Sequence, residues 1–227
     1  MMESDAPIEL IIFDCDGVLV DSEVIFNEIL TDDLRSRGMH LSLDETMELF
    51  LGGSMEGVKA EVLSRGLALP EQWVEDLYAK VLNRLKQGVD AIDGVLDLLK
   101  ALNQNKLPFC VASNGPVHKM DITLGSTGLL PFFENAVFSA YEINSWKPEP
   151  ELFLTAAKHF GVSAAHCVVI EDSHNGTLAA KHAGMRCLGF APHGPDERLS
   201  NNGALCFTHM HEVAGLLKLV DGAEKRT

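Results

Sequence analysis

The chain has no long hydrophobic run, no strongly basic stretch and no paired set of cysteines. Its apolar runs all fall short of the roughly 18 residues that mark a membrane-spanning helix. The N-terminal segment MMESDAPIEL has neither the basic nor the apolar region of a secretory signal peptide. The five cysteines are scattered without a C-x-x-C pair, which fits buried free thiols in a reducing compartment. We therefore expect a cytoplasmic protein that makes no membrane contact.

Positive charge is also scarce, with 18 Lys and Arg against 33 Asp and Glu and a formal net charge of −15. The negative electrostatic potential of such a chain disfavours nucleic acid and anionic membrane surfaces as partners. It would also repel an anionic substrate at long range, so a site for one must bring its own cations. We expect a small-molecule ligand, no nucleic acid partner, and a monomer or weak dimer.

The composition, 46% apolar and 22% charged, is that of an ordinary soluble protein. A length of 227 residues is enough to bury a sizeable core. Short apolar runs rich in β-branched residues alternate with segments of helical periodicity along most of the chain. This alternation predicts an α/β fold, a Rossmann-like doubly wound parallel sheet with helices on both faces. The expected strands are residues 8–13, 107–112, 136–139, 167–171, 185–190 and 204–207, and the expected helices lie near 94–104, 116–127, 150–160 and 174–183.

Residues 20–88 depart from this alternation, because helical periodicity continues there without a strand and glycines punctuate it as helix ends. The pattern predicts a helical cap domain of residues 19–89 inserted into an α/β core of residues 1–18 and 90–227. The connecting segments near 17–21 and 87–93 would be its hinges.

The first expected strand runs directly into the sequence DCDG, which brings two aspartates together. Side chains two residues apart on a strand point to the same face, so Asp14 and Asp16 would lie side by side. At about 5 Å and an effective dielectric constant near 20, their repulsion would be roughly 3 kcal/mol. A bound cation would relieve this repulsion, so the pair predicts one.

Polar side chains also follow three other expected strands: Ser113 and Asn114, then Lys147 in WKPEPELF, then Glu171 and Asp172. Open α/β sheets bind ligands at the carboxyl ends of their strands. Several carboxylates suit a hard cation such as Mg²⁺, which also takes substrate phosphate oxygens. A lysine and the free N–H groups at a helix start suit the phosphate itself.

Each of these clusters alone has a structural explanation as a turn, a helix cap or a solvated acidic loop. Their recurrence at four strand ends of one sheet is much harder to explain by local structure. The pattern therefore favours a binding site for a metal ion and a phosphate.

In order and spacing, the segments DCDGVLVDS, SNGP, WKPEPELF and VIEDSHNGTLAAKHAGM resemble the four motifs of the haloacid dehalogenase superfamily. The chain is most similar to its β-phosphoglucomutase-like subgroup, which carries a helical cap after the first strand. Within that subgroup it looks most like the bacterial phosphatases of phosphosugars and 6-phosphogluconate. The resemblance covers essentially the whole chain and implies a Mg²⁺-dependent phosphatase for a small phosphorylated metabolite, such as a phosphosugar or a phosphosugar acid.

The resemblance implies two different roles for the paired aspartates. Asp14 would be the nucleophile that attacks phosphorus and forms a phospho-aspartate. Asp16 would be the acid that protonates the leaving oxygen and then the base that activates water. A metal-bound Asp14 would stay ionised, while Asp16 off the metal can hold a proton.

The resemblance also implies the binding residues. Mg²⁺ would be held by Asp14, the Asp16 carbonyl and Asp172, with Glu171 bound directly or through water. The phosphoryl oxygens would be held, and catalysis assisted, by Ser113, Asn114, Gly115 and Lys147. The cap would select the substrate through Gly52, Gly53 and Ser54, with Lys59, Arg65 and Lys80 as nearby cations. Trp146 fits either the pocket wall or the core.

Three rival functions share parts of this pattern. A β-phosphoglucomutase-type phosphomutase, the main alternative, shares Val18 but would place a His and an Arg where this chain has Phe26 and Met55. A dehalogenase of the superfamily normally lacks the aspartate at position 16. A receiver-like signalling domain, the non-enzyme alternative, is much shorter and carries its acidic pair on a separate strand.

Overall fold

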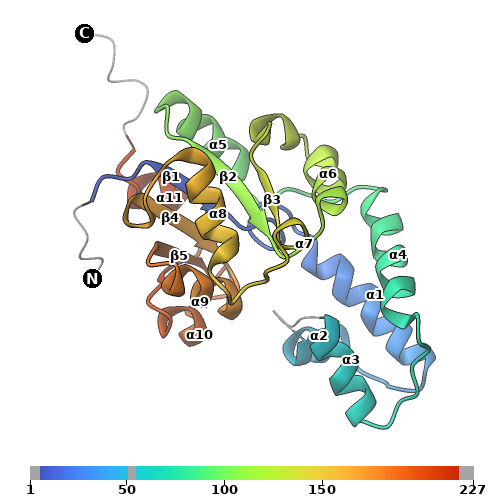
Figure 1. Ribbon diagram of the computed structural model, residues 1–227. Coiled ribbons are helices and arrows are strands. Elements are labelled where there is room, and N and C mark those ends of the chain that lie inside the picture. Colours follow the sequence, from blue (N-terminus) through green and yellow to red (C-terminus); the bar gives the residue numbers. More distant parts are fainter. Residues whose placement is uncertain (1–5, 51–54, 220–227) are drawn as a thin grey trace.

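A six-stranded parallel sheet runs through the larger of two lobes, with the strand order β3-β2-β1-β4-β5-β6 (Figure 1). The computed structural model describes residues 6–50 and 55–219. The strands are β1 (Leu10–Phe13), β2 (Phe109–Ser113), β3 (Val137–Ser139), β4 (Cys167–Glu171), β5 (Arg186–Phe190) and β6 (Leu205–Phe207). The predicted α/β fold is confirmed, and every expected strand is present with both ends within two residues of the expected ones.

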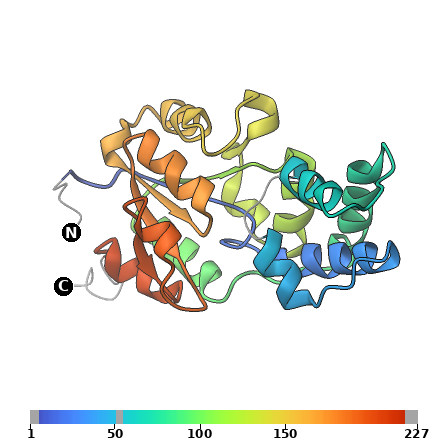
Figure 2. The ribbon, with the colours of Figure 1, turned by 90° about the horizontal axis from the view of Figure 1, so that it is seen from below.

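Alternate residues of β1 pack against opposite layers of helices. Leu10 and Ile12 belong to one apolar cluster and Ile11 and Phe13 to another, and all four side chains are fully buried. Burial on both faces explains why this strand is apolar throughout. The first layer contains α8 (Glu151–Phe160), α9 (His174–His182) and α10 (Glu197–Ser200), and the second contains α5 (Val95–Gln104), α6 (Val117–Ser126) and α11 (His211–Leu216) (Figures 1 and 2).

The sequence patterns did not predict the shortest elements of the fold. These are α7 (Ala140–Ile143), α10, α11 and the 3₁₀ turns η1 (Leu130–Phe133) and η2 (Ala164–His166). Segments of three to six residues are too short to show a helical period. None of the described helices is long and apolar enough to cross a membrane.

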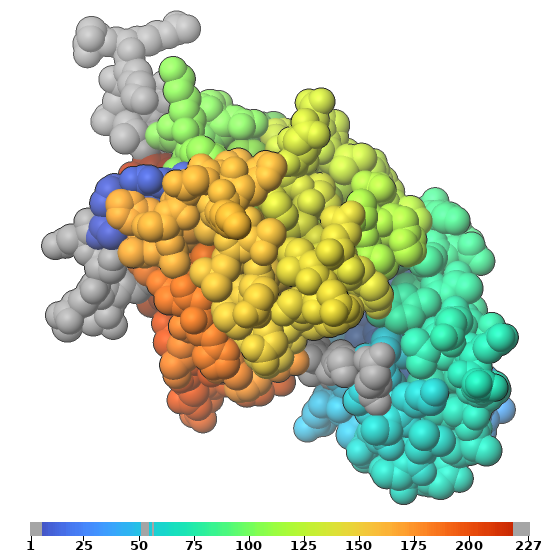
Figure 3. All heavy atoms as spheres, viewed as in Figure 1, coloured from blue at the N-terminus to red at the C-terminus, as the bar shows by residue number. Residues whose placement is uncertain are grey.

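Four helices follow β1 and form the second lobe beside the sheet (Figures 1 and 3). They are α1 (Glu23–Ser36), α2 (Leu43–Phe50), α3 (Met55–Ser64) and α4 (Trp73–Leu85). They enclose their own apolar cluster around the fully buried Trp73, and α4 also contacts α6 of the larger lobe. As expected, this part of the chain contains no strand among its described residues.

The two segments that join the lobes are hydrogen bonded to each other. Val20 forms an antiparallel bridge with Ala91. The Asp21 N–H donates to the Asp90 carbonyl at 2.9 Å, and the Ile92 N–H donates to the Leu19 carbonyl at 3.0 Å. Both connecting segments lie within the stretches that the sequence suggested as hinges. Because they are hydrogen bonded to each other, we expect them to move together.

A buried ion cluster ties α1 to α4 within the second lobe. Asp33 is 6% exposed and accepts hydrogen bonds from Trp73 Nε1, Arg37 Nε and Lys80 Nζ, each at 2.7 Å. Burial alone would raise the pKa of Asp33, but the hydrogen bonds from Arg37, Lys80 and Trp73 outweigh it and lower the pKa to about 2. The ionised carboxylate therefore stabilises this lobe.

Asp33→Asn should lower the free energy of unfolding at pH 7 by about 2–3 kcal/mol, since a pKa near 2 instead of 3.8 favours the folded carboxylate by roughly that amount. A lowered pKa stabilises the fold above pH 4 and loses its effect as the pH falls toward 2, so the variant and the wild type should converge in acid. Urea unfolding at pH 7 and pH 3, followed by circular dichroism, measures both differences.

The neighbouring Asp32→Asn is the matched control. Asp32 is exposed and paired only with Arg35 on the surface, so its loss should change stability by less than about 1 kcal/mol. Equal losses in the two variants at pH 7 would contradict a stabilising role for the buried cluster.

Candidate active site

The carboxyl ends of β1, β2 and β4 meet at one edge of the sheet, around a cavity of about 630 Å³. Its walls include every core residue that the sequence pointed to: Asp14, Asp16, Ser113, Asn114, Gly115, Lys147, Glu171 and Asp172. Gly52, Gly53 and Ser54 lie outside the described residues. Two of the suggested cap cations are paired elsewhere, Arg65 with Glu61 and Lys80 with Asp33.

Lys147 lies at the centre of this edge, although it comes from the loop after β3. It is 5% exposed, and its Nζ contacts a carboxylate oxygen of Asp14 and Oε1 of Glu171, the latter at 2.6 Å. Its backbone N–H donates to Asn114 Oδ1 at 2.9 Å. The Asn114 side chain therefore anchors the Lys147 loop, and the lysine lies where it neutralises Asp14.

Glu171 is fully buried and bound to protein donors on both oxygens. Lys147 donates to Oε1, while Oε2 accepts from the N–H groups of Asp172 and Ser173 and from the Ser173 hydroxyl at 2.9–3.0 Å. A Cβ at Gly176 would overlap this carboxylate, so the glycine lets α9 approach it. These contacts make Glu171 an anchor for Lys147 and for the start of α9. The suggested contact of Glu171 with a metal, directly or through water, stays a prediction.

Asp16 has two partners that the sequence interpretation missed. Lys119 Nζ lies 2.8 Å from Asp16 Oδ1, and the Ser22 hydroxyl donates to the same oxygen. Lys119 lies in the first turn of α6, and side chains on a helix tilt toward its N-terminus. That tilt, applied to the SNGPVHKM segment, would have pointed Lys119 back toward the strand ends.

The two paired aspartates have opposite pKa shifts. Burial raises the pKa of Asp14 to about 7, and repulsion from Glu171 and Asp16 adds to this effect while Lys147 opposes it. Burial also favours a higher pKa at Asp16, but Lys119 and Ser22 outweigh it and lower the pKa. The two shifts differ because burial dominates at Asp14, whose lysine also pairs with Glu171, whereas the ion pair with Lys119 and the Ser22 hydrogen bond dominate at Asp16. The roles expected for a metal-bound Asp14 and a protonated Asp16 stay predictions.

The site carries more negative charge than its own cations offset. Burial raises the pKa of Glu23 to about 7 and the pKa of Asp172 well above its ordinary value, and repulsion from neighbouring carboxylates adds to both shifts. Among the described residues, no group of three or more His, Cys, Asp or Glu side chains is arranged so that it could hold a metal ion as it stands. The excess of carboxylate nevertheless fits a hard divalent cation at Asp14 and Asp172.

Gly17 closes the turn after Asp16 and permits Asp172 to come against it. Its φ is +77°, and a Cβ at this position would lie 2.9 Å from Asp172 Cγ and closer still to Oδ2. Any side chain here would both strain the backbone and displace Asp172 from the site.

Gly17→Ala should therefore lower both activity and stability. Gly66→Ala is a matched control, because Gly66 also has a positive φ, +85°, but its Cβ would meet nothing within 4 Å. The control should lose about 1 kcal/mol of unfolding free energy from the backbone effect alone, with turnover unchanged. Gly17→Ala should lose more stability and at least about tenfold in turnover, or 1.4 kcal/mol. Urea unfolding and steady-state phosphate release measure the two effects, and equal turnover in both variants would contradict the contact.

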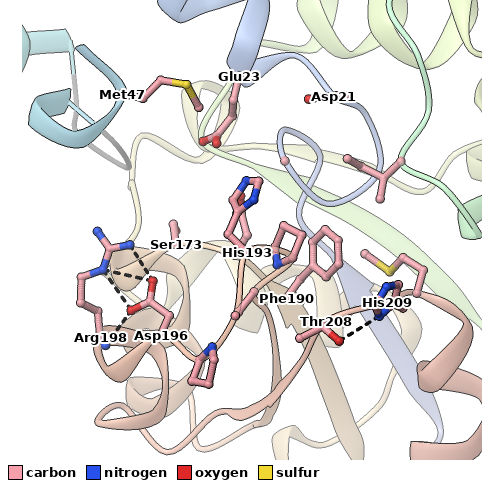
Figure 4. A pocket seen from close by; sticks show the side chains of 18 of the residues that line it. Asp21, Glu23, Met47, Ser173, Phe190, His193, Asp196, Arg198, Thr208 and His209 are labelled. Atoms are coloured by element: carbon pink, nitrogen blue, oxygen red, sulfur yellow. Dashed lines mark hydrogen bonds and ion pairs between the residues drawn. The ribbon is translucent and has the colours of Figure 1, made fainter. Parts of the chain in front are cut away.

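A second cavity, of about 930 Å³, lies on the other side of Asp172 and Glu23. Figure 4 shows Glu23 and Met47 from the helical lobe facing His193 and the Arg198–Asp196 ion pair of the sheet lobe across it. Glu23 and Asp172 line both cavities. These two carboxylates thus form part of the wall between them.

The model of the haloacid dehalogenase-like hydrolase family matches residues 8–184, which include the whole constellation around Asp14. The chain belongs to the haloacid dehalogenase-like hydrolase family. The expected family, the α/β fold and an enzymatic function are thereby confirmed.

Two relatives of this haloacid dehalogenase-like hydrolase are phosphatases from Escherichia coli (strain K12). Its 6-phosphogluconate phosphatase is 33% identical over 213 residues, which cover 93% of this chain and 95% of the relative. Its hexitol phosphatase B is 30% identical and covers 78% of this chain and 81% of the relative. A haloacid dehalogenase family hydrolase from Deinococcus radiodurans R1, solved with bound phosphate and sodium, is 32% identical with a TM-score of 0.80, covering 95% of this chain and 97% of that one. These relatives support the phosphatase activity expected from the sequence.

Proposed function

We propose that the chain is a Mg²⁺-dependent phosphatase that hydrolyses a phosphosugar or a phosphosugar acid through a phospho-aspartate on Asp14. The observation that carries the proposal is the placement of Asp14 against the buried Lys147, at the floor of a cavity that Asp16 also lines. The named activities of the two E. coli relatives support the substrate class.

In the first step an Asp14 carboxylate oxygen attacks phosphorus, and the bond from phosphorus to the leaving oxygen breaks. Asp16 gives its proton to that oxygen, so the leaving group departs as a neutral alcohol. Lys147 offsets the charge on Asp14 and on the phosphoryl oxygens. Ser113, whose hydroxyl accepts the Gly115 N–H at 3.0 Å, has its own proton free for a phosphoryl oxygen.

In the second step Asp16 takes a proton from water, the water oxygen bonds to phosphorus, and the Asp14–phosphorus bond breaks to release phosphate. The ion pair with Lys119 favours the ionised Asp16 that this step needs. The first step needs the protonated form, and an arriving phosphate dianion would favour it by drawing Lys119 away and repelling the Asp16 carboxylate. Lys119 thus favours the ionised form of Asp16 when it pairs with that carboxylate, and it permits the protonated form when it moves to the phosphate.

Asp14, Asp172 and the main-chain carbonyl of Asp16 are the groups that would hold Mg²⁺. When bound, the ion supplies positive charge that keeps Asp14 ionised and screens the phosphate. The helical lobe, residues 19–89, would act as a cap that closes over residues 1–18 and 90–227 to exclude water during the reaction.

A specific observation favours the phosphatase over the phosphomutase. Phe26 and Met55, which replace the His and Arg expected of a mutase, both line the cavity from the cap side. Apolar side chains cannot hold the second phosphate of a bisphosphate. The leaving group would therefore diffuse away and water would complete the reaction.

A phosphate-release screen tests the proposal. Sugar phosphates, 6-phosphogluconate, glycerol phosphates and nucleotides should be compared with and without EDTA, followed by addition of Mg²⁺. We expect release from the sugar-derived esters that EDTA abolishes and Mg²⁺ restores. Conversion of β-glucose 1-phosphate without phosphate release would instead support the mutase, and release from none of these esters would contradict both.

A further inference from the structure

Two exposed aromatic side chains line the active-site cavity on its sheet-lobe side. Tyr141 is 53% exposed and Trp146 is 40% exposed, and their rings meet edge to face with centroids 5.5 Å apart. Trp146 therefore forms part of the pocket wall and not of the core. Large aromatic surfaces left open beside a catalytic carboxylate are suited to contact a ligand.

The backbone of Trp146 is held in a fixed position relative to the reacting groups. Its carbonyl accepts the Glu149 N–H at 2.9 Å. The next residue, Lys147, is fixed at its backbone by Asn114 and at its Nζ by Asp14. The Trp146 ring thus lies on a segment that is tied to Lys147, and it lines the same cavity, so it can contact a leaving group that is bound there.

The cap side of the cavity is mainly apolar. Among the described residues, its lining there is Phe26, Asn27, Phe50, Met55, Val74, Tyr78 and Val81, together with Ser22 and Glu23 at the start of α1. The leaving group would thus lie between two hydrophobic walls, one from the cap and one from the Tyr141–Trp146 pair.

The charges around the cavity disfavour an additional anion. Its lining lysines are Lys119 and Lys147, and each is already paired with a carboxylate. Glu23 and Asp172 lie on the same walls. A carboxylate on the leaving group would meet apolar surface and like charge.

We propose that Tyr141 and Trp146 form a stacking wall for the leaving group, and that the enzyme prefers an uncharged leaving group with an apolar ring face over a carboxylated open chain. This inference rests on the proposed phosphatase function and narrows its substrate class. A pyranose ring presents such a C–H face, whereas the open chain of a sugar acid does not.

Matched esters test the preference. Glucose 6-phosphate, sorbitol 6-phosphate and 6-phosphogluconate carry the phosphate on the same carbon but differ in ring closure and in charge. We expect kcat/KM to fall in that order, with about tenfold or more between the first and the last. An equal or higher value for 6-phosphogluconate would overturn the preference for uncharged leaving groups.

Variants test the stacking wall itself. Trp146→Ala should lower the ratio of kcat/KM for glucose 6-phosphate to that for acetyl phosphate about tenfold, mainly through KM, because acetyl phosphate has no ring to stack. Trp146→Phe should restore most of the ratio, and Tyr141→Ala should lower it less. Leu154→Ala, at an exposed apolar side chain of α8, is the control and should leave the ratio unchanged. An equal loss for both esters in Trp146→Ala would overturn the stacking role.

Binding provides a readout that does not depend on turnover. The chain has two tryptophans, and Trp73 is fully buried in the cap. In Asp14→Asn, glucose 6-phosphate should change the tryptophan emission, and Trp146→Phe in the same background should abolish the change. A response with no phosphate release from any ester would reject the proposed function but support the wall. Release of phosphate without any response from Trp146 would reject the wall alone.

Discussion

Asp14→Asn should lower kcat for phosphate release by at least about a thousandfold, or roughly 4 kcal/mol in activation free energy. The amide has the size of the carboxylate but neither its charge nor its nucleophilic oxygen. It would still accept a hydrogen bond from Lys147, so the variant should remain folded. Steady-state phosphate release measures the loss, and labelling with a radioactive phosphate ester followed by acid quench should detect a phospho-enzyme in the wild type only.

Asp121→Asn is the matched control for this prediction. Asp121 is an exposed carboxylate on α6, so the same chemical change there should leave kcat within about twofold, a difference below 0.5 kcal/mol. Turnover above a hundredth of the wild-type value in Asp14→Asn would reject Asp14 as the nucleophile. Matching thermal melts of the two variants would show that the loss concerns chemistry and not folding.

Lys147→Met should lower the free energy of unfolding at pH 8 by about 3–5 kcal/mol, because it leaves the buried Asp14 and Glu171 without their shared cation. Burial already raises the folded-state pKa of Asp14, and without Lys147 nothing in the variant opposes that effect. Raised carboxyl pKa values destabilise the fold increasingly as the pH rises, so the deficit should be smaller at pH 5. Urea unfolding in EDTA at the two pH values measures the difference.

Lys181→Met provides the comparison, since Lys181 is an exposed residue in the last turn of α9. It should change stability by less than about 1 kcal/mol at either pH. A deficit in Lys147→Met that was equally small, or that did not depend on pH, would show that the ion pairs at Asp14 and Glu171 contribute little to folding.

The sequence predicted the strands and the long helices because their apolar periods extend over enough residues to be recognised. It also predicted Asp14, Ser113 and Asp172 as neighbours, because one rule, that parallel strands present their carboxyl ends at one edge, brings distant segments together. The motif WKPEPELF pointed to Lys147 as a site residue, although only the structure shows that its ammonium is buried between Asp14 and Glu171.

The sequence interpretation missed both partners of Asp16, although the tilt of side chains on a helix indicated the direction of Lys119. Ser22 and Lys119 come from two different helical segments, and their meeting at one carboxylate depends on how α1 and α6 pack. The pKa order of Asp14 and Asp16 depends on the same meeting, because pairing with a lysine at 2.8 Å outweighs burial at Asp16. Spacing along the chain carries no information on such distances.

The hydrogen bonds between the two segments that join the lobes extend to the loop that carries Asp16 and Gly17. The Gly17 N–H donates to the Val20 carbonyl at 2.9 Å, Asp16 forms a bridge with Val20, and Val20 pairs in turn with Ala91. Ser22, which opens the first cap helix, donates to the Asp16 carboxylate. A rotation of the helical lobe would therefore move Asp16, the proposed proton donor, with it. The orientation of this lobe and the hydrogen bonds that set the acidity of Asp16 would then change together.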